Sequence, residues 1–122
     1  MSDLHITTHA TPAGPALALR GELDHHSAPL LREAIDRVTL HADEQMVLDL
    51  SGLTFCDSSG ITAFIVARNR TLESGAAIAL AGTPPHILRV LRIVGLDQIF
   101  PLHPDTGTAA AVWAQTRNPV GP

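Results

Sequence analysis

The 122-residue sequence contains no lysine, no tyrosine and a single cysteine, and aromatic residues make up only 3% of it. Without lysine the chain cannot form a Walker-type phosphate loop, a Schiff base or a Ser-x-x-Lys nucleophile pair. The lone Cys56 cannot form an internal disulfide, so we expect a reducing compartment, the cytoplasm. The scarcity of aromatic residues also leaves no series of rings on which nucleic-acid bases could stack.

Positive charge and long apolar segments are scarce as well. Eight arginines against twelve acidic residues give a formal net charge of −4, so the chain lacks a broad positive field for phosphate backbones or anionic lipids. No apolar run approaches the roughly 20 residues of a membrane-spanning helix, and the N-terminus shows no secretory signal. We therefore expect neither nucleic acid nor a membrane among the partners, while the oligomeric state stays open.

The length and the 45% content of apolar residues suit one domain, which we place at residues 1–115 with a disordered tail at 116–122. Alternating apolar residues on both sides of the turn-forming segment 11–15 predict an N-terminal β-hairpin. Ser27 then begins an amphipathic helix that we extend to about His41. The apolar run 46–50 predicts a central strand covered on both faces.

A second helix follows the segment Phe-Cys-Asp-Ser-Ser-Gly at 55–60. Its apolar residues recur at helical spacing from Ile61 to Leu72 and include Phe64 and Ile65. We expect a strand at 76–81, followed by a helix that opens at 83–85 and ends before a capping Gly95. The apolar stripe of this helix consists of Ile87, Val90, Leu91 and Val94. A short edge strand at 96–100 and a helix at 108–115 that packs Trp113 on the core complete the expected elements.

This order of elements predicts an α/β fold. A mixed sheet of four to five strands is opened by the hairpin and accompanied by three to four helices, and right-handed crossovers make its inner strands parallel. In open α/β sheets, functional groups gather beyond the carboxyl ends of the parallel strands. Asp57, Ser58 and Ser59 occupy such a place, at a junction between a strand and a helix.

Three stretches carry a more specific pattern: Gly-Glu-Leu-Asp-His-His at 21–26, then Val-Leu-Asp-Leu-Ser followed by Phe-Cys-Asp-Ser-Ser-Gly-Ile between 47 and 61, and Leu-Arg-Ile-Val-Gly-Leu at 91–96. In this order and spacing they resemble the STAS domain family, and specifically the bacterial anti-sigma factor antagonists. The resemblance covers roughly residues 4–102 and implies the STAS fold. The Asp-Ser-Ser-Gly segment alone would be weak support for the family. The three stretches together, in this order and spacing, make the resemblance specific.

The resemblance implies a non-enzymatic regulator without a cofactor. In its unphosphorylated form such a protein binds an anti-sigma factor, usually itself a serine kinase, and so frees a sigma factor for transcription. Phosphorylation of the serine that directly follows the Asp of the motif, here Ser58, switches the protein off, and a serine phosphatase reverses the modification. A phosphate there adds a charge of about −1.5 to −2 beside Asp57, and beside Asp24 if the two loops meet.

We expect the partner to bind the loop at 21–27, the junction at 57–60 and the exposed side of the following helix. The candidate contact residues are Glu22, Asp24, His25, Ser27, Asp57, Ser59, Gly60, Thr62 and Asn69.

Simpler interpretations compete at several of these positions. The segment 57–60 is also a good N-cap and turn, and capping is compatible with phosphorylation. Asp49 suits a hydrogen-bonded strand carboxylate better than a catalytic one, and the seven histidines show no metal-binding spacing, so we expect no metal site. Cys56, which precedes an acid, suits a buried small residue.

Two other functions remain open. The first is a STAS subunit of a stress-signalling or lipid-transport complex, which would share the fold but bind a different partner. The second is a small serine hydrolase that uses Ser58, although a Gly-x-Ser-x-Gly elbow would require glycine at the position of Cys56.

Overall fold

A β-hairpin opens the chain, as the sequence predicts. In the computed structural model, which describes residues 3–117, β1 (Leu4–Thr11) pairs antiparallel with β2 (Gly14–Leu23). The Thr11 hydroxyl accepts hydrogen bonds from the N–H groups of Ala13 and Gly14, which closes the turn. Gly14 has a φ of +144°, and an added Cβ would lie 2.3 Å from the Gln45 carbonyl oxygen, so this position requires glycine.

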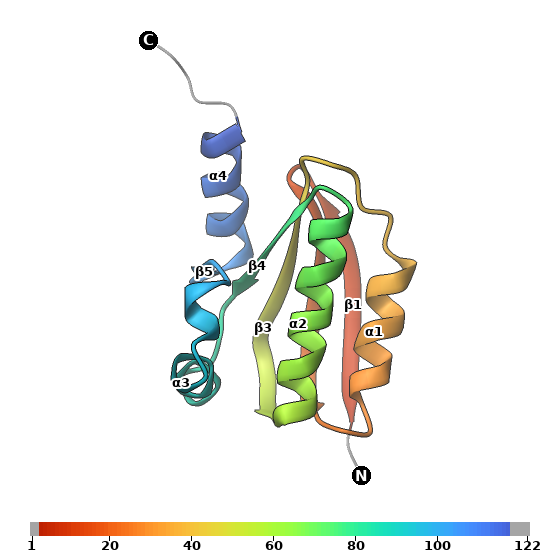
Figure 1. The fold of residues 1–122 in the computed structure, drawn as a ribbon, viewed down its shortest axis with the longest axis vertical. Helices are drawn as coiled ribbons and strands as arrows, with labels where there is room; N and C mark the ends of the chain where they lie inside the picture. The colour runs from red at the N-terminus through yellow and green to blue at the C-terminus, as the bar shows by residue number, and fades with distance from the viewer. Residues whose placement is uncertain (1–2, 118–122) are drawn as a thin grey trace.

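The remaining strands extend the sheet in sequence order. β3 (Gln45–Cys56), β4 (Ala77–Ala81) and the short β5 (Leu102–His103) add parallel to β2, so the described sheet has the order β1-β2-β3-β4-β5. This confirms the predicted mixed α/β fold with antiparallel strands only in the opening hairpin (Figure 1).

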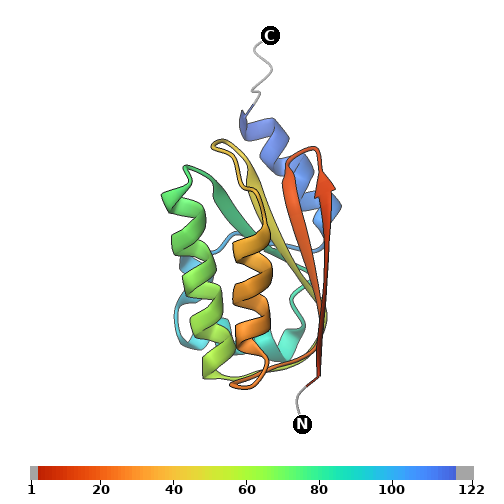
Figure 2. The same cartoon turned by 90° about the vertical axis from the view of Figure 1, so that its right-hand side faces the viewer.

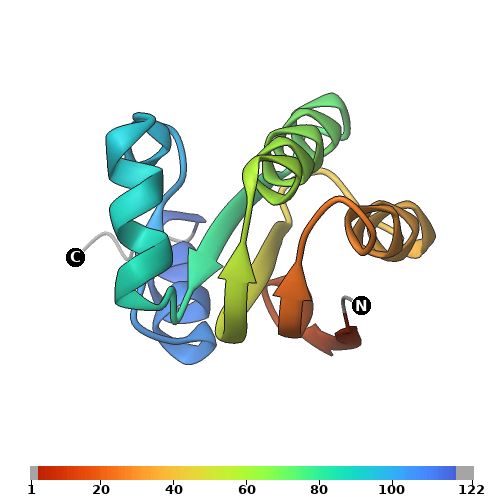
Figure 3. The same cartoon turned by 90° about the horizontal axis from the view of Figure 1, so that it is seen from below.

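Four α-helices of the described residues cover the sheet unequally. α1 (Ala28–Arg37) and α2 (Ser58–Glu73) lie side by side on one face, with both N-terminal ends at the same end of the molecule (Figure 2). α4 (Thr106–Arg117) lies on the opposite face, and α3 (Pro85–Ile93) packs near the β4–β5 end (Figure 3). The two loops that precede α1 and α2 therefore meet at one edge of the sheet.

Two hydrophobic layers separate the helices from the sheet. The larger one contains long side chains such as Phe64, Leu48 and Leu80, each fully buried. The smaller one, beneath α4, consists of Ala16, Val47, Ala81 and Ala109. Small side chains allow α4 to approach the sheet closely, but they remove less apolar surface from water.

The segment after α3 differs from the prediction. Residues 96–100, expected as an edge strand, begin with the 3₁₀ helix η1 (Leu96–Gln98), and the edge strand follows at β5. The physical reason is the spacing of the apolar residues. Leu96 and Phe100 are both buried four residues apart, and the N–H of Phe100 donates to the carbonyl of Leu96 over 3.0 Å. This is helical periodicity and not the alternation of a strand.

The apolar stripes of three helices also need correction. On α2 the buried face contains Phe64 and small residues, whereas Ile65 is 36% exposed and Leu72 is 54% exposed. On α3 the buried residues are Ile87 and Leu91, and the expected Val90 and Val94 face solvent in large part. On α4 the buried residue is Ala109. Trp113 is half-buried, and the Arg117 guanidinium lies over its ring, with the Arg117 Cζ atom 5.2 Å from the ring centroid.

Several element boundaries shift as well. α1 ends at Arg37 instead of about His41, because Val38 is already extended, and β3 is longer than the expected run 46–50. α4 continues through Arg117, two residues beyond the expected domain boundary, and the rest of the expected tail lies outside the described residues. Within residues 3–117, none of the helices combines the length and apolar character needed to span a bilayer.

The burial difference between two neighbouring residues of α2 gives a direct stability prediction. Phe64→Ala removes a ring that is 0% exposed, and we expect it to lower the free energy of unfolding by about 3–5 kcal/mol. Ile65→Ala, one residue further along the same helix, should cost less than about 1 kcal/mol. Urea unfolding followed by circular dichroism measures both values, and similar losses for the two variants would contradict the assigned helix orientation.

Candidate functional site

The junction between β3 and α2 is capped by Asp57. Its carboxylate Oδ1 accepts hydrogen bonds from the N–H groups of Ser59 and Gly60, over 2.8 Å and 3.2 Å. Asp57 therefore satisfies two of the donors that a helix N-terminus leaves unpaired. Ser58 is the first helical residue, and its side chain is exposed. The predicted capping role thus belongs to Asp57 and leaves the Ser58 hydroxyl available.

Close packing beneath the junction explains the glycine that follows. Gly60 is buried, and an added Cβ would lie 2.6 Å from the Cys56 sulfur and 2.8 Å from Leu23 Cγ. The N–H of Asp57 also donates to the carbonyl of Leu23 over 3.2 Å, which joins the ends of β2 and β3. Gly60 therefore supports the site from below rather than offering a surface to a partner.

The loop before α1 is organised by Asp24 and Ser27. Asp24 Oδ1 accepts hydrogen bonds from the N–H groups of His26 (2.9 Å) and Ser27 (3.1 Å). The buried Ser27 hydroxyl donates to the carbonyl of Glu22 over 2.7 Å and accepts from the N–H of Asp24. Ser27 precedes α1 as predicted, but its hydroxyl bonds within the loop and makes no cap bond to the helix. His25 is exposed, and Glu22 is half-buried.

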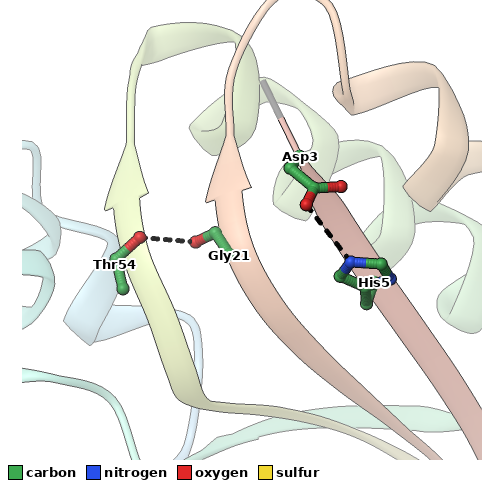
Figure 4. A network of polar contacts seen from close by, with 4 residues as sticks. All are labelled: Asp3, His5, Gly21 and Thr54. Atoms are coloured by element: carbon green, nitrogen blue, oxygen red, sulfur yellow. Dashed lines mark hydrogen bonds and ion pairs between the residues drawn. The ribbon is translucent and has the colours of Figure 1, made fainter. Parts of the chain in front are cut away.

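The start of this loop is fixed to both neighbouring strands. Gly21 has a φ of +110°, and an added Cβ would lie 2.1 Å from the carbonyl oxygen of Asp3. The Thr54 hydroxyl of β3 donates to the Gly21 carbonyl over 3.0 Å, and His5 Nε2 lies 3.3 Å from Asp3 Oδ2 on the other side (Figure 4). The loop at 21–27 is consequently held against the end of β3.

The two candidate residues further along α2 lie at different distances from the junction. Thr62 is exposed one turn after Ser58, and its hydroxyl donates to the Ser58 carbonyl over 2.9 Å. Asn69 is exposed too, but eleven residues of helix separate it from Ser58, roughly 16 Å along the axis. The structure therefore brings Thr62 to the site and leaves Asn69 at a distance.

Sequence reasoning missed two residues beside the junction. Phe55 is 47% exposed at the end of β3, which is unusual for an aromatic ring in a central strand. Arg32 of α1 borders a groove of about 210 Å³ between the first turns of α1 and α2. The residues that line this groove are His25, Ala28, Pro29, Arg32, Ser59 and Thr62. The signal for Arg32 in the sequence was its i, i+4 spacing from Ala28, because this spacing places Arg32 on the same face of α1 as the buried Ala28.

The chemistry of Cys56 follows from its position under the junction. Burial first, and the neighbouring Asp57 carboxylate second, raise the pKa of its thiol to about 12. The thiol therefore stays protonated at neutral pH, and a thiol in this state is a poor nucleophile. Within residues 3–117, no three His, Cys, Asp or Glu side chains are grouped closely enough to hold a metal ion.

This pKa predicts slow thiol chemistry in the folded protein. At pH 8 we expect native Cys56 to react with Ellman's reagent at least about tenfold more slowly than Cys56 of the urea-unfolded chain, whose pKa returns to about 9. Stopped-flow absorbance measures the two rates. Equal rates would show that the thiol is neither buried nor held protonated. The native rate should stay below the unfolded rate throughout pH 7 to 9, because the native thiol is almost wholly protonated over this range.

Comparisons with known proteins agree with this geometry. The family model described as "Mlab, STAS domain" matches residues 6–103. An anti-sigma F factor antagonist of Paenibacillus polymyxa is 33% identical over 86 residues, which are 70% of this chain and 74% of that protein.

Two solved structures share the fold. An anti-sigma factor antagonist from Mycobacterium paratuberculosis superposes with a TM-score of 0.80 at 24% identity and covers 90% of this chain and 93% of that one. The Bacillus cell fate determinant SpoIIAA in its phosphorylated form superposes with a TM-score of 0.65 at 21% identity, covering 88% of this chain and 96% of that one. With its sheet order, its capped Asp-Ser-Ser-Gly junction and these matches, the chain belongs to the STAS domain family.

Proposed function

We propose that this protein is an anti-sigma factor antagonist controlled by phosphorylation of Ser58. In the unphosphorylated form it binds an anti-sigma factor that is also a serine kinase, and a sigma factor is released. The kinase then modifies Ser58 and the complex dissociates, until a serine phosphatase restores the hydroxyl. The relatives named as anti-sigma factor antagonists support the class of partner.

The observation that carries this proposal is the state of the Ser58 side chain. It is exposed, and none of the hydrogen bonds within residues 3–117 uses its hydroxyl, because Asp57 performs the capping. A kinase can therefore reach the hydroxyl, and its modification removes no interaction that stabilises α2. The fold should survive phosphorylation while the surface changes.

Charge at the junction supports an effect on binding. The Asp57 and Asp24 carboxylates both lie at this end of the molecule, on loops joined through the Leu23 carbonyl. A phosphate adds a charge of about −1.5 to −2 to this surface. A partner that docks here without a matching cation must desolvate that charge, which weakens binding by roughly 1.4–4 kcal/mol, or about ten- to a thousandfold.

An apolar contact beside the serine is available for the partner. Phe55, three residues before Ser58, exposes 47% of its surface at the end of β3, and Val66 exposes 42% about two turns further along α2. Exposed aromatic rings at the centre of an interface commonly contribute much of the binding energy. The proposed surface thus combines an apolar anchor with a hydroxyl whose charge can change.

The central test compares variants of Ser58 in binding to the anti-sigma factor. We expect Ser58→Ala to bind within about threefold of the wild type and Ser58→Asp to bind about tenfold or more weakly, because a single negative charge partly mimics phosphate. Isothermal titration calorimetry measures the affinities. Thr39→Asp, an exposed change of the same charge away from the junction, serves as the control. Equal affinities for all Ser58 variants would remove this residue from the mechanism.

Direct phosphorylation is tested by incubating the protein with candidate anti-sigma kinases and ATP, followed by mass spectrometry of the peptides. We expect one phosphate, at Ser58, and none in Ser58→Ala. A phosphate found only at Ser59 or Thr62 would contradict the assignment. A phosphatase of the serine class should then restore binding.

Phe55 provides an independent prediction about the surface. Phe55→Ser should weaken binding to the anti-sigma factor by about tenfold or more, since it deletes an exposed ring next to the junction. Leu72→Ser is the matched control, because Leu72 is 54% exposed at the opposite end of α2 and should change affinity less than about twofold. Calorimetry on both variants decides the matter, and a larger loss for Leu72→Ser would place the interface elsewhere.

Two further experiments separate the alternatives. Recovery of a membrane transporter instead of a kinase in a pull-down would favour a STAS subunit of a transport complex. A serine hydrolase needs a base for Ser58, yet within residues 3–117 no histidine is hydrogen-bonded to it, and His86 Nε2 lies 3.0 Å from the Thr54 carbonyl. Stoichiometric labelling of Ser58 by a serine-directed phosphonate would support the hydrolase instead.

A further inference from the structure

The groove between α1 and α2 adjoins the proposed phosphorylation site. Ser59 and Thr62 form its α2 wall, while His25 and Arg32 contribute from the side of α1. Ser58 and Thr62 are four residues apart and share one stripe of α2, and the Thr62 hydroxyl donates to the Ser58 carbonyl. Ser58 itself does not line the groove, but it adjoins Ser59 and lies one helical turn before Thr62, so a group attached to its side chain is within reach of the groove.

Arg32 is the cation that faces this groove. None of the ion pairs found within residues 3–117 involves Arg32, whereas Arg37 at the other end of α1 lies 4.0 Å from Glu33 and Arg70 of α2 lies 3.4 Å from Asp36. Side chains of a helix lean toward its N-terminus. Since α1 and α2 have their N-termini at the same end (Figure 2), this general tendency favours an Arg32 side chain that reaches toward the end of α2 that carries Ser58.

Four backbone donors near Ser58 already have acceptors. The N–H groups of Ser59 and Gly60 donate to Asp57 Oδ1, and those of His26 and Ser27 donate to Asp24 Oδ1. A phosphate on Ser58 cannot use these four groups without breaking their bonds, and it lies near two carboxylates. A guanidinium, which can donate two parallel hydrogen bonds to phosphate oxygens, is the group suited to hold it.

We propose that Arg32, with His25 beside it, is an internal receptor for the phosphate of phosphorylated Ser58. This inference rests on the proposed function, because it needs a phosphate at that position. The phosphate turns into the groove between α1 and α2, where the Arg32 guanidinium donates hydrogen bonds to two of its oxygens. The modified side chain then fills the groove, so a partner can no longer use the groove for binding.

The receptor is tested on the protein alone, with phosphoserine incorporated genetically at position 58. A ³¹P NMR titration measures the second pKa of the phosphate, which is about 6 when no cation is near. A neighbouring cation favours the dianion, so we expect the pKa in the otherwise wild-type protein to lie about 0.5–1 unit below that of the Arg32→Gln variant. Arg32→Lys, which retains the charge, should give an intermediate value.

Arg37→Gln is the matched control, since it removes an arginine from the same helix but away from the groove. It should leave the phosphate pKa unchanged. His25→Gln removes the imidazole that borders the same groove and should shift the phosphate pKa less than Arg32→Gln does. The ionisable groups Glu22, Asp24, His26 and Asp57 at this end are present in every variant and cancel in the comparison.

Equal titration of the Arg32→Gln, Arg37→Gln and unsubstituted phosphoproteins would overturn the receptor. Because the phosphoserine is encoded genetically, this result does not depend on a kinase. Failure of any kinase to modify Ser58 would remove the proposed function without altering the titration, and equal titration would remove the receptor while the binding data on Ser58 variants stand. The variants are exposed substitutions, and circular dichroism before titration confirms that each is folded.

Discussion

The parallel pairing of β2 with β3 is the constraint on which the site depends. This pairing runs to the last residues of both strands, Leu23 and Cys56, and the Asp57 N–H continues it by donating to the Leu23 carbonyl. Parallel strands end at the same edge of the sheet, so the two following loops and the two helix N-termini are brought together. Gly60 makes the close approach possible, because any side chain there would collide with Cys56 and Leu23.

The division of labour between adjacent residues follows from this arrangement. Asp57 caps α2, Gly60 packs beneath it, and none of the hydrogen bonds within residues 3–117 uses the hydroxyl of Ser58. In the same way Asp24 and Ser27 build the neighbouring loop from inside and leave His25 outside. In both loops, some polar residues hold the backbone in place through hydrogen bonds, while their neighbours are exposed and form the surface.

Much of this arrangement could be predicted from the sequence. The turn residues at 11–15, the helix start after Asp57 and the spacing of the apolar residues identify the elements, and their order defines the mixed sheet. What could not be predicted is which apolar residues face outward. Ile65 and Phe64 fit the same helical pattern, and only the small residues Ala63 and Ala67, which allow close packing, decide that Phe64 is the buried one. Arg32 was missed for a related reason, because its neighbour across the groove comes from another helix.

The small-residue layer beneath α4 has a consequence for how the molecule opens. Ala16, Val47, Ala81 and Ala109 hold this helix to the sheet with little apolar area, whereas the opposite face is filled by leucines and Phe64. The free energy needed to detach an element scales with the contacts that it loses. Amide protons of α4 should accordingly exchange with solvent through local opening, well before those of the leucine-rich strands, so that the C-terminal helix behaves as a separate cooperative unit on the back of the sheet.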